Sequence, residues 1–162
     1  MSTMIETTTR VYEIYIKAPP ERIWEAITSP EWTRRYGYGG DVHIELRPGG
    51  TYKHIAGPEM KGVTEDDVVV VGEVIEADPP RRLVQTWHPL WDEATAAEVP
   101  TRLTYEITPA YGESTKLSLT HELEGAPLAA AMITGSIEGA GGGWPFVLSD
   151  LKTLLETGSR VG

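Results

Sequence analysis

The hydrophobic pattern of the chain changes its period near residue 125, and this change restricts the fold more than any other feature. Before that point, segments such as 101–108 and 115–123 alternate apolar and polar residues, which is typical of strands with one buried face. After it, apolar residues recur at spacings of three and four, which predicts a long helix. They are Trp144, Val147, Leu148, Leu151, Leu154 and Leu155. A sheet with one apolar face needs a cover, and this final helix supplies it.

The segments that precede the alternating strands complete the order of elements. Residues 11–18 predict a first strand, which Pro19 and Pro20 end. Two short helical segments follow, at 19–28 and 31–37. With six further strands before the final helix, the predicted fold class is α+β. We expect a helix-grip fold, in which a curved antiparallel seven-stranded sheet wraps around a long C-terminal helix, with two short helices after the first strand.

Composition narrows the classes of partner. The chain has 24 acidic and 14 basic residues, a formal net charge of -10, which disfavours nucleic acid and anionic membranes as partners. It has no cysteine, which excludes disulfides and thiol catalysis. No apolar run approaches the roughly 20 residues that a membrane helix needs, and the first residues do not resemble a signal peptide. We therefore expect a cytoplasmic protein without membrane insertion.

A sheet that curls around a helix is expected to leave a hollow. A twisted sheet cannot contact a helix evenly along its whole length, so a gap tends to remain where the sheet flares. At roughly 24 cal/mol per Å³, an empty gap of about 300 Å³ would cost on the order of 7 kcal/mol. The gap should therefore hold a ligand or water, or be narrowed by large side chains. The 5 Trp and 7 Tyr against 1 Phe favour a lining of aromatic side chains with polar tips.

Alternation in the strands assigns some side chains to the inner face of the sheet, and the helical spacing assigns others to the apolar stripe of the last helix. The candidate ligand-binding residues are Tyr52, His54, Trp87, Trp91, Leu103, Tyr105, His121, Trp144, Leu148 and Leu151. Inward aromatic and histidine side chains belong more often to a core than to a site, so each assignment is a hypothesis. The facing of Trp91 and of Glu73 stays open at this point.

Motifs of several chemical classes are missing from the sequence. The four histidines are scattered without an HxxxH or HExxH pair, and we predict neither a metal ion nor another cofactor. No GxSxG nucleophile motif is present. The glycine-rich segment 139–143 precedes a helix but lacks the Lys-Ser/Thr of a phosphate loop, and we interpret it as a hinge or a plain connector.

General acid–base chemistry is the enzymatic option that the sequence leaves open. His54, His121 and Tyr105 are the candidate catalytic residues, since an inward imidazole or phenol can transfer protons in a partly dry cavity. Such a role needs a partner, for example Tyr105 for His121, or a carboxylate such as Glu73 or Glu106.

Three segments carry a resemblance to a known family: IYIKAPPERIWEAITSPEW, then RPGGTYKH with GEVIEADPPRRLVQTW, and finally GGGWPFVLSDLKTLLETG. On these the chain resembles the SRPBCC superfamily of START-like and birch-pollen-allergen-like proteins. It is most similar to the branch named for activators of the Hsp90 ATPase. The resemblance implies that residues 1–162 form a single SRPBCC/START-like domain with its core at 10–158 and a deep pocket between sheet and helix. Members bind lipids, sterols, hormones or polyketides, and a few are enzymes.

Three hypotheses about function follow. The first is a non-catalytic protein that binds a small hydrophobic or aromatic molecule in the cavity, in a stress or secondary-metabolite context. The second is an enzyme of the polyketide cyclase or aromatase kind that uses a histidine or tyrosine in the cavity. The third is a protein-interaction module like a co-chaperone, which predicts an exposed patch outside the pocket. A homodimer is compatible with all three.

Overall fold

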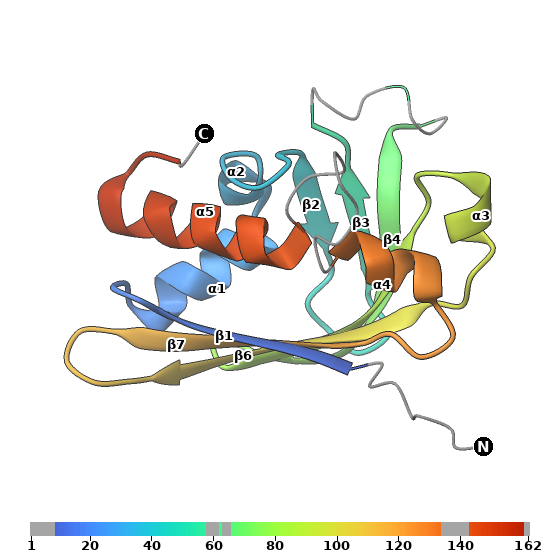
Figure 1. The fold of residues 1–162 in the computed structure, drawn as a ribbon. Coiled ribbons are helices and arrows are strands. Elements are labelled where there is room, and N and C mark those ends of the chain that lie inside the picture. The colour runs from blue at the N-terminus through green and yellow to red at the C-terminus, as the bar shows by residue number, and fades with distance from the viewer. Residues whose placement is uncertain (1–8, 58–61, 63–65, 134–142, 161–162) are drawn as a thin grey trace, which may run out of the picture.

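A seven-stranded antiparallel sheet is the largest element of the structure (Figure 1). The structure is a computed structural model that describes residues 9–57, 62, 66–133 and 143–160. The strands follow the order β1-β7-β6-β5-β4-β3-β2 across the sheet. They are β1 (Thr9–Ile16), β2 (Asp41–Ile44), β3 (Thr51–Ile55), β4 (Val68–Asp78), β5 (Arg82–Pro89), β6 (Thr101–Pro109) and β7 (Thr115–Glu122).

Most strands pair with their neighbours in sequence. β2 to β7 pair consecutively and antiparallel, and β1 completes the sheet by pairing with β7. In that pair Tyr12 lies opposite Leu119 and Ile14 lies opposite Leu117. The apolar faces of two strands that are far apart in sequence therefore form one continuous inner surface.

Helices cover this inner surface. Those among the described residues are α1 (Pro20–Thr28), α2 (Pro30–Thr33), α3 (Glu93–Ala96), α4 (Pro127–Ile133) and α5 (Gly143–Thr157). Figure 1 shows α5 running above β1, β6 and β7 while β2, β3 and β4 rise beside it, so the sheet curves around the helix. The predicted helix-grip fold is confirmed. Across the described segments, no helix combines the length and the apolar character needed to cross a membrane.

Burial confirms the alternation in the strands. Leu103 on β6, together with Leu117 and Leu119 on β7, is at most 1% exposed. On the outer side of β1, Val11 is 59% exposed and Tyr15 is 56% exposed. The apolar stripe of α5 also faces the core, where Leu148, Leu151 and Leu154 are buried.

Several elements differ in detail from the prediction. The helix expected over 31–37 is only the single turn of α2, after which the chain turns towards β2. α3 and α4 go beyond the predicted elements; α3 begins after Asp92, whose side chain accepts a hydrogen bond from the Thr95 backbone N–H at 2.7 Å. Of the glycine-rich segment 139–143, only Gly143 is among the described residues, and it begins α5 with a φ of 62°.

Candidate functional site

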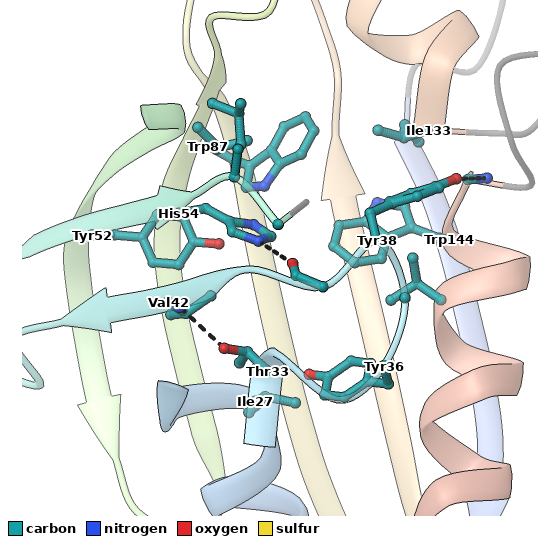
Figure 2. A pocket seen from close by; sticks show the side chains of 18 of the residues that line it. Ile27, Thr33, Tyr36, Tyr38, Val42, Tyr52, His54, Trp87, Ile133 and Trp144 are labelled. Carbon is teal, nitrogen blue, oxygen red and sulfur yellow. Dashed lines mark hydrogen bonds between the residues drawn. The ribbon is translucent and has the colours of Figure 1, made fainter. Parts of the chain in front are cut away.

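A hollow of about 640 Å³ lies between the inner face of the sheet and the first turns of α5 (Figure 2). Its walls come from β3 to β6, the segment between α2 and β2, the end of α4 and the start of α5. This volume is within the range of about 300–1,000 Å³ that is usual for pockets that hold small molecules. The lining is largely aliphatic and aromatic, with a few polar side chains.

Most of the candidate residues line this hollow. Those on its wall are Tyr52, His54, Trp87, Trp91, Tyr105 and Trp144. The other four, Leu103, His121, Leu148 and Leu151, are buried but are not part of the lining. They face inward, as alternation in the strands and the apolar stripe of the last helix predict, but they lie where packed side chains leave no open space.

The sequence reasoning missed the wall between α2 and β2. Tyr36, Gly37, Tyr38 and Gly39 all line the hollow. The sequence analysis placed Tyr36 and Gly37 in a helix over 31–37, whereas α2 ends at Thr33 and residues 36–39 belong neither to a helix nor to a strand. It also missed Gln85, which lies on the inner face of β5 and is 1% exposed.

A buried carboxylate on α5 holds this wall in place. Asp150 is fully buried and accepts hydrogen bonds from the Gly37 backbone N–H at 2.8 Å and from Arg160 Nη2 at 3.0 Å. The same Arg160 nitrogen donates to the Gly37 carbonyl at 2.6 Å. One residue further along the wall, the Tyr38 hydroxyl accepts a hydrogen bond from the backbone N–H of Gly143, at the start of α5, at 3.0 Å. The wall is therefore fastened to α5 at two points.

His54 reaches the same wall from β3. Its Nε2 lies 2.9 Å from the Gly39 carbonyl oxygen (Figure 2). A carbonyl only accepts, so Nε2 carries the proton and Nδ1 keeps its lone pair. Burial lowers the pKa of His54, and the Gly39 carbonyl and the Asp41 charge oppose that shift only in part. The imidazole is therefore neutral at neutral pH.

Gly40 allows the close approach between His54 and the wall. Its φ is +88°, in the left-handed region. A Cβ at this position would lie 2.2 Å from the Ile55 carbonyl oxygen and 2.9 Å from His54 Nε2. Any other residue would push β3 and the wall apart.

His121 lies behind the lining and holds two tryptophans. Its Nδ1 accepts a hydrogen bond from Trp144 Nε1 at 3.1 Å, and its Nε2 lies 2.7 Å from Thr101 Oγ1. The Thr101 hydroxyl donates its one proton to the Trp87 carbonyl at 2.7 Å, so Nε2 donates to it. The imidazole ring also meets the Trp87 ring edge-on, with centroids 5.0 Å apart.

These contacts remove His121 as an acid–base candidate within this geometry. Both ring nitrogens are occupied, and the hypothesised pair with Tyr105 is not formed. Burial lowers the pKa of His121 to about 3, so the ring stays neutral at any ordinary pH. Its function in the described structure is to position Trp87 and Trp144.

The predicted carboxylate partners lie elsewhere. Glu73 is exposed on β4, and Glu106 is exposed and 3.0 Å from Arg82 Nη1. Among the described lining residues there is no Asp, Glu, Lys or Arg. Over the same part of the chain, no three His, Cys, Asp or Glu side chains gather in a way that could hold a metal ion.

Three tyrosines give the hollow its polar side. Burial raises the pKa of Tyr36, Tyr52 and Tyr105, so all three phenols stay protonated. The pKa of Tyr105 is raised further by Tyr52 and Tyr36, which places the three phenols within electrostatic range of one another. The Tyr36 hydroxyl donates to the Ala26 carbonyl at 2.9 Å.

Solved structures share this fold. CalU16 from Micromonospora echinospora matches in its solution structure with a TM-score of 0.64 and 20% identity, over 95% of this chain and 68% of that one. The crystal structure of CalU16 matches with a TM-score of 0.52 and 22% identity, over 70% of this chain and 59% of that one. The chain thus spans about three fifths of that crystallised protein.

Two further neighbours match over more than nine tenths of both chains. PFC0360w, an HSP90 activator from Plasmodium falciparum, matches with a TM-score of 0.64 and 18% identity, over 91% of this chain and 96% of that one. The Aha1 dimer from Colwellia psychrerythraea matches with a TM-score of 0.65 and 19% identity, over 93% and 97%. At these identities the likeness establishes the fold alone.

Comparison with family models gives a match over residues 17–156, to the model described as Activator of Hsp90 ATPase homolog 1-like protein. Among curated proteins compared by sequence, none matches. The match covers most of the chain and includes β2 to β7 and nearly all of α5.

Proposed function

The chain belongs to the Activator of Hsp90 ATPase homolog 1-like family, as the resemblance implied, and we propose that it binds a small hydrophobic or aromatic molecule without transforming it. The binding site in this proposal is the hollow between the sheet and α5. The observation that carries the proposal is a volume of about 640 Å³ lined mainly by apolar and aromatic side chains.

The size of the hollow supports an occupant. The hollow of about 640 Å³ is partly open to solvent, so water fills it when no ligand is bound. A largely apolar wall offers that water few hydrogen-bond partners. An apolar molecule gains from the same wall about 25 cal/mol per Å² of apolar surface that it buries.

Native mass spectrometry of the protein purified from its own host tests the proposal. We expect an additional mass that is released on denaturation. The variant Val70→Phe, which adds bulk to a residue of the lining, should lose this mass, whereas Val11→Phe on the outer side of β1 should keep it. If both variants keep the mass, or if the wild type binds no apolar compound, the proposal is wrong.

An enzyme of the polyketide cyclase or aromatase kind is the second candidate, and His54 is the observation that favours it. The Gly39 carbonyl fixes the proton on Nε2 and leaves the Nδ1 lone pair to act as a base. This role predicts that His54→Gln abolishes turnover of a polyketide substrate while the protein still binds it. Unchanged turnover in that variant would exclude His54 as the base.

A co-chaperone-like role is the third candidate. It is favoured by the family description and by exposed Val11 and Tyr15 on the outer side of the edge strand β1. The double variant Val11→Glu/Tyr15→Glu should then lose retention on an immobilised Hsp90 middle domain. Absence of retention of the wild type would count against this role.

We also propose a homodimer, because one structural neighbour is the Aha1 dimer from Colwellia psychrerythraea. Sedimentation equilibrium at micromolar protein concentration tests it. A single species of 17.8 kDa would contradict a dimer.

A further inference from the structure

Two phenols and one amide on the wall of the hollow have hydrogen-bonding capacity that the described residues leave unused. The side-chain oxygens of Tyr52 and Tyr105 form no hydrogen bond with a described residue, in contrast to Tyr36 with its 2.9 Å bond to Ala26. Figure 2 shows the Tyr52 hydroxyl directed from β3 towards the interior of the pocket. A hydroxyl has one proton to donate and two lone pairs to accept with, so each phenol can bind a ligand oxygen in either sense.

Gln85 adds an amide to this polar side. It is 1% exposed, and within the described structure its one side-chain hydrogen bond is a long one, from Nε2 to the Thr86 carbonyl at 3.3 Å. The Gln85 side-chain oxygen accepts no hydrogen bond from a described residue, yet it is not sealed in the core, because among the described residues the buried polar side-chain atom without a partner is Trp91 Nε1. Gln85 can therefore accept a hydrogen bond from a molecule in the hollow.

The sheet register places these groups on one side of the hollow. Leu83 lies opposite Tyr105 and Gln85 lies opposite Leu103, so Gln85 and Tyr105 are diagonal neighbours on the inner face. Tyr52 is within electrostatic range of Tyr105. Trp87 lies two residues after Gln85 on β5. Its ring and the Trp144 ring form the aromatic part of the wall, with their centroids 6.1 Å apart.

The described part of the wall carries no group that would neutralise a charged ligand. The described lining residues include neither a carboxylate nor a Lys or Arg, and His54 is neutral. A carboxylate buried there would lose its hydration without gaining a cation. The net charge of -10 adds a repulsive field for anions outside the hollow.

We propose that the ligand is uncharged and amphiphilic, with hydroxyl or carbonyl oxygens that bind Tyr52, Tyr105 and Gln85 and an apolar ring system that contacts Trp87 and Trp144. This inference rests on the proposed binding function and specifies the chemistry of the ligand. We therefore expect fused-ring alcohols, phenols and ketones to bind. We expect fatty acids and other carboxylates to bind weakly, although an apolar cavity of this size has room for them.

Matched pyrene derivatives test the inference by fluorescence titration at about pH 7.4 in about 0.15 M salt, a concentration that screens surface charge. The probes are pyrene-1-methanol, pyrene-1-carboxylate, pyrene-1-methylamine and 1-methylpyrene, which share one ring system and differ in one substituent. We expect the alcohol to bind at least tenfold more tightly than the carboxylate and the ammonium. Binding of either charged probe as tightly as the alcohol would overturn the inference.

Isosteric variants test the named residues. The double variant Tyr52→Phe/Tyr105→Phe should bind pyrene-1-methanol about tenfold more weakly, the factor that corresponds to about one net hydrogen bond. It should bind 1-methylpyrene, which has no oxygen, as the wild type does. Gln85→Leu should show the same pattern. Tyr111→Phe is the matched control, since Tyr111 is 97% exposed and should leave every affinity unchanged.

The outcomes separate this inference from the proposed function. If all four probes bind with equal affinity, the hollow is a binding site but the proposed preference for uncharged polar ligands is wrong. The same conclusion follows if the phenylalanine variant weakens the binding of the alcohol and of 1-methylpyrene by the same factor. If no probe binds up to its solubility limit, the proposed function itself is wrong. The phenylalanine variants keep the shape of the lining, and a thermal unfolding midpoint at or above that of the wild type shows that they fold.

Discussion

Lowering the pH from about 7.5 to about 5.0 should destabilise the protein through His121. Burial lowers the pKa of His121 to about 3 in the folded protein, whereas an unfolded chain gives histidine its ordinary pKa of about 6.5. Between these two values the unfolded chain takes up a proton that the folded protein refuses. The contribution of His121 to stability is therefore complete above about pH 6.5 and is lost progressively as the pH falls towards about 3.

The magnitude follows from the difference between the two pKa values. Each pH unit inside the window removes about 1.4 kcal/mol of unfolding free energy per proton. A fall from about pH 6.5 to about pH 5.0 therefore removes about 2 kcal/mol through this one ring. Above about pH 5 most carboxyl groups are still ionised in both states, so they contribute little to the slope in this range.

Urea unfolding at several pH values between about 7.5 and 5.0 measures the effect. The variant His121→Leu removes the titrating ring, and its stability should fall by about 2 kcal/mol less than that of the wild type over this range. His54, whose pKa is also lowered by burial, contributes to both proteins and cancels in the comparison. The variant His43→Leu, at an exposed position on β2, serves as the control for replacing a histidine by leucine. Equal slopes for the wild type and His121→Leu would refute the reasoning.

Three further substitutions test how the wall and the core are held. Asp150→Ala leaves the buried Gly37 N–H without its acceptor and should cost about 2–4 kcal/mol in urea unfolding, whereas Asp150→Asn, which keeps an oxygen, should cost less. Gly40→Ala forces a Cβ to within 2.2 Å of a backbone oxygen, and we expect a lower thermal midpoint and altered amide shifts in β3; an unchanged spectrum would contradict the close approach. Leu117→Ala, at a fully buried position, should cost about 2–5 kcal/mol, against less than about 0.5 kcal/mol for the exposed Val11→Ala.

The fold could be predicted because its main signals are local. Alternation in 101–108 and 115–123 identifies two strands and their buried faces, and the stripe on residues 144–155 identifies the covering helix. Short hairpin turns then leave few ways to order the strands. The sequence did not predict α3 and α4, because each helix is too short for a hydrophobic period to appear.

The candidate site could be predicted only on the sheet side. Alternation predicted that Tyr52, Trp87 and Tyr105 face the inner side of the sheet, and all three line the hollow, because strand geometry determines the direction of these side chains. The wall at Tyr36–Gly39 could not be found in this way. Its position depends on Asp150, which is 113 residues away from Gly37 and lies off the apolar stripe of α5.

His121 shows the limit of reasoning from facing alone. Alternation placed it inward, and it is inward, but its two nitrogens are bound to Trp144 and Thr101 instead of facing the hollow. Whether an inward histidine faces a cavity or a neighbouring side chain depends on contacts between β6, β7 and α5. No periodicity along one strand contains that information.

A titration of ¹⁵N-labelled protein with pyrene-1-methanol, followed by NMR, measures binding at the hollow most directly. We expect saturable shifts in the indole N–H signals of Trp87 and Trp144 and in the backbone amides of residues 36–40, with little change at Val11 and Tyr15 on the outer face. The same titration of Val70→Phe should give no saturable shifts at these positions. Shifts confined to the outer face of β1, or shifts that persist unchanged in Val70→Phe, would contradict a ligand site between the sheet and α5.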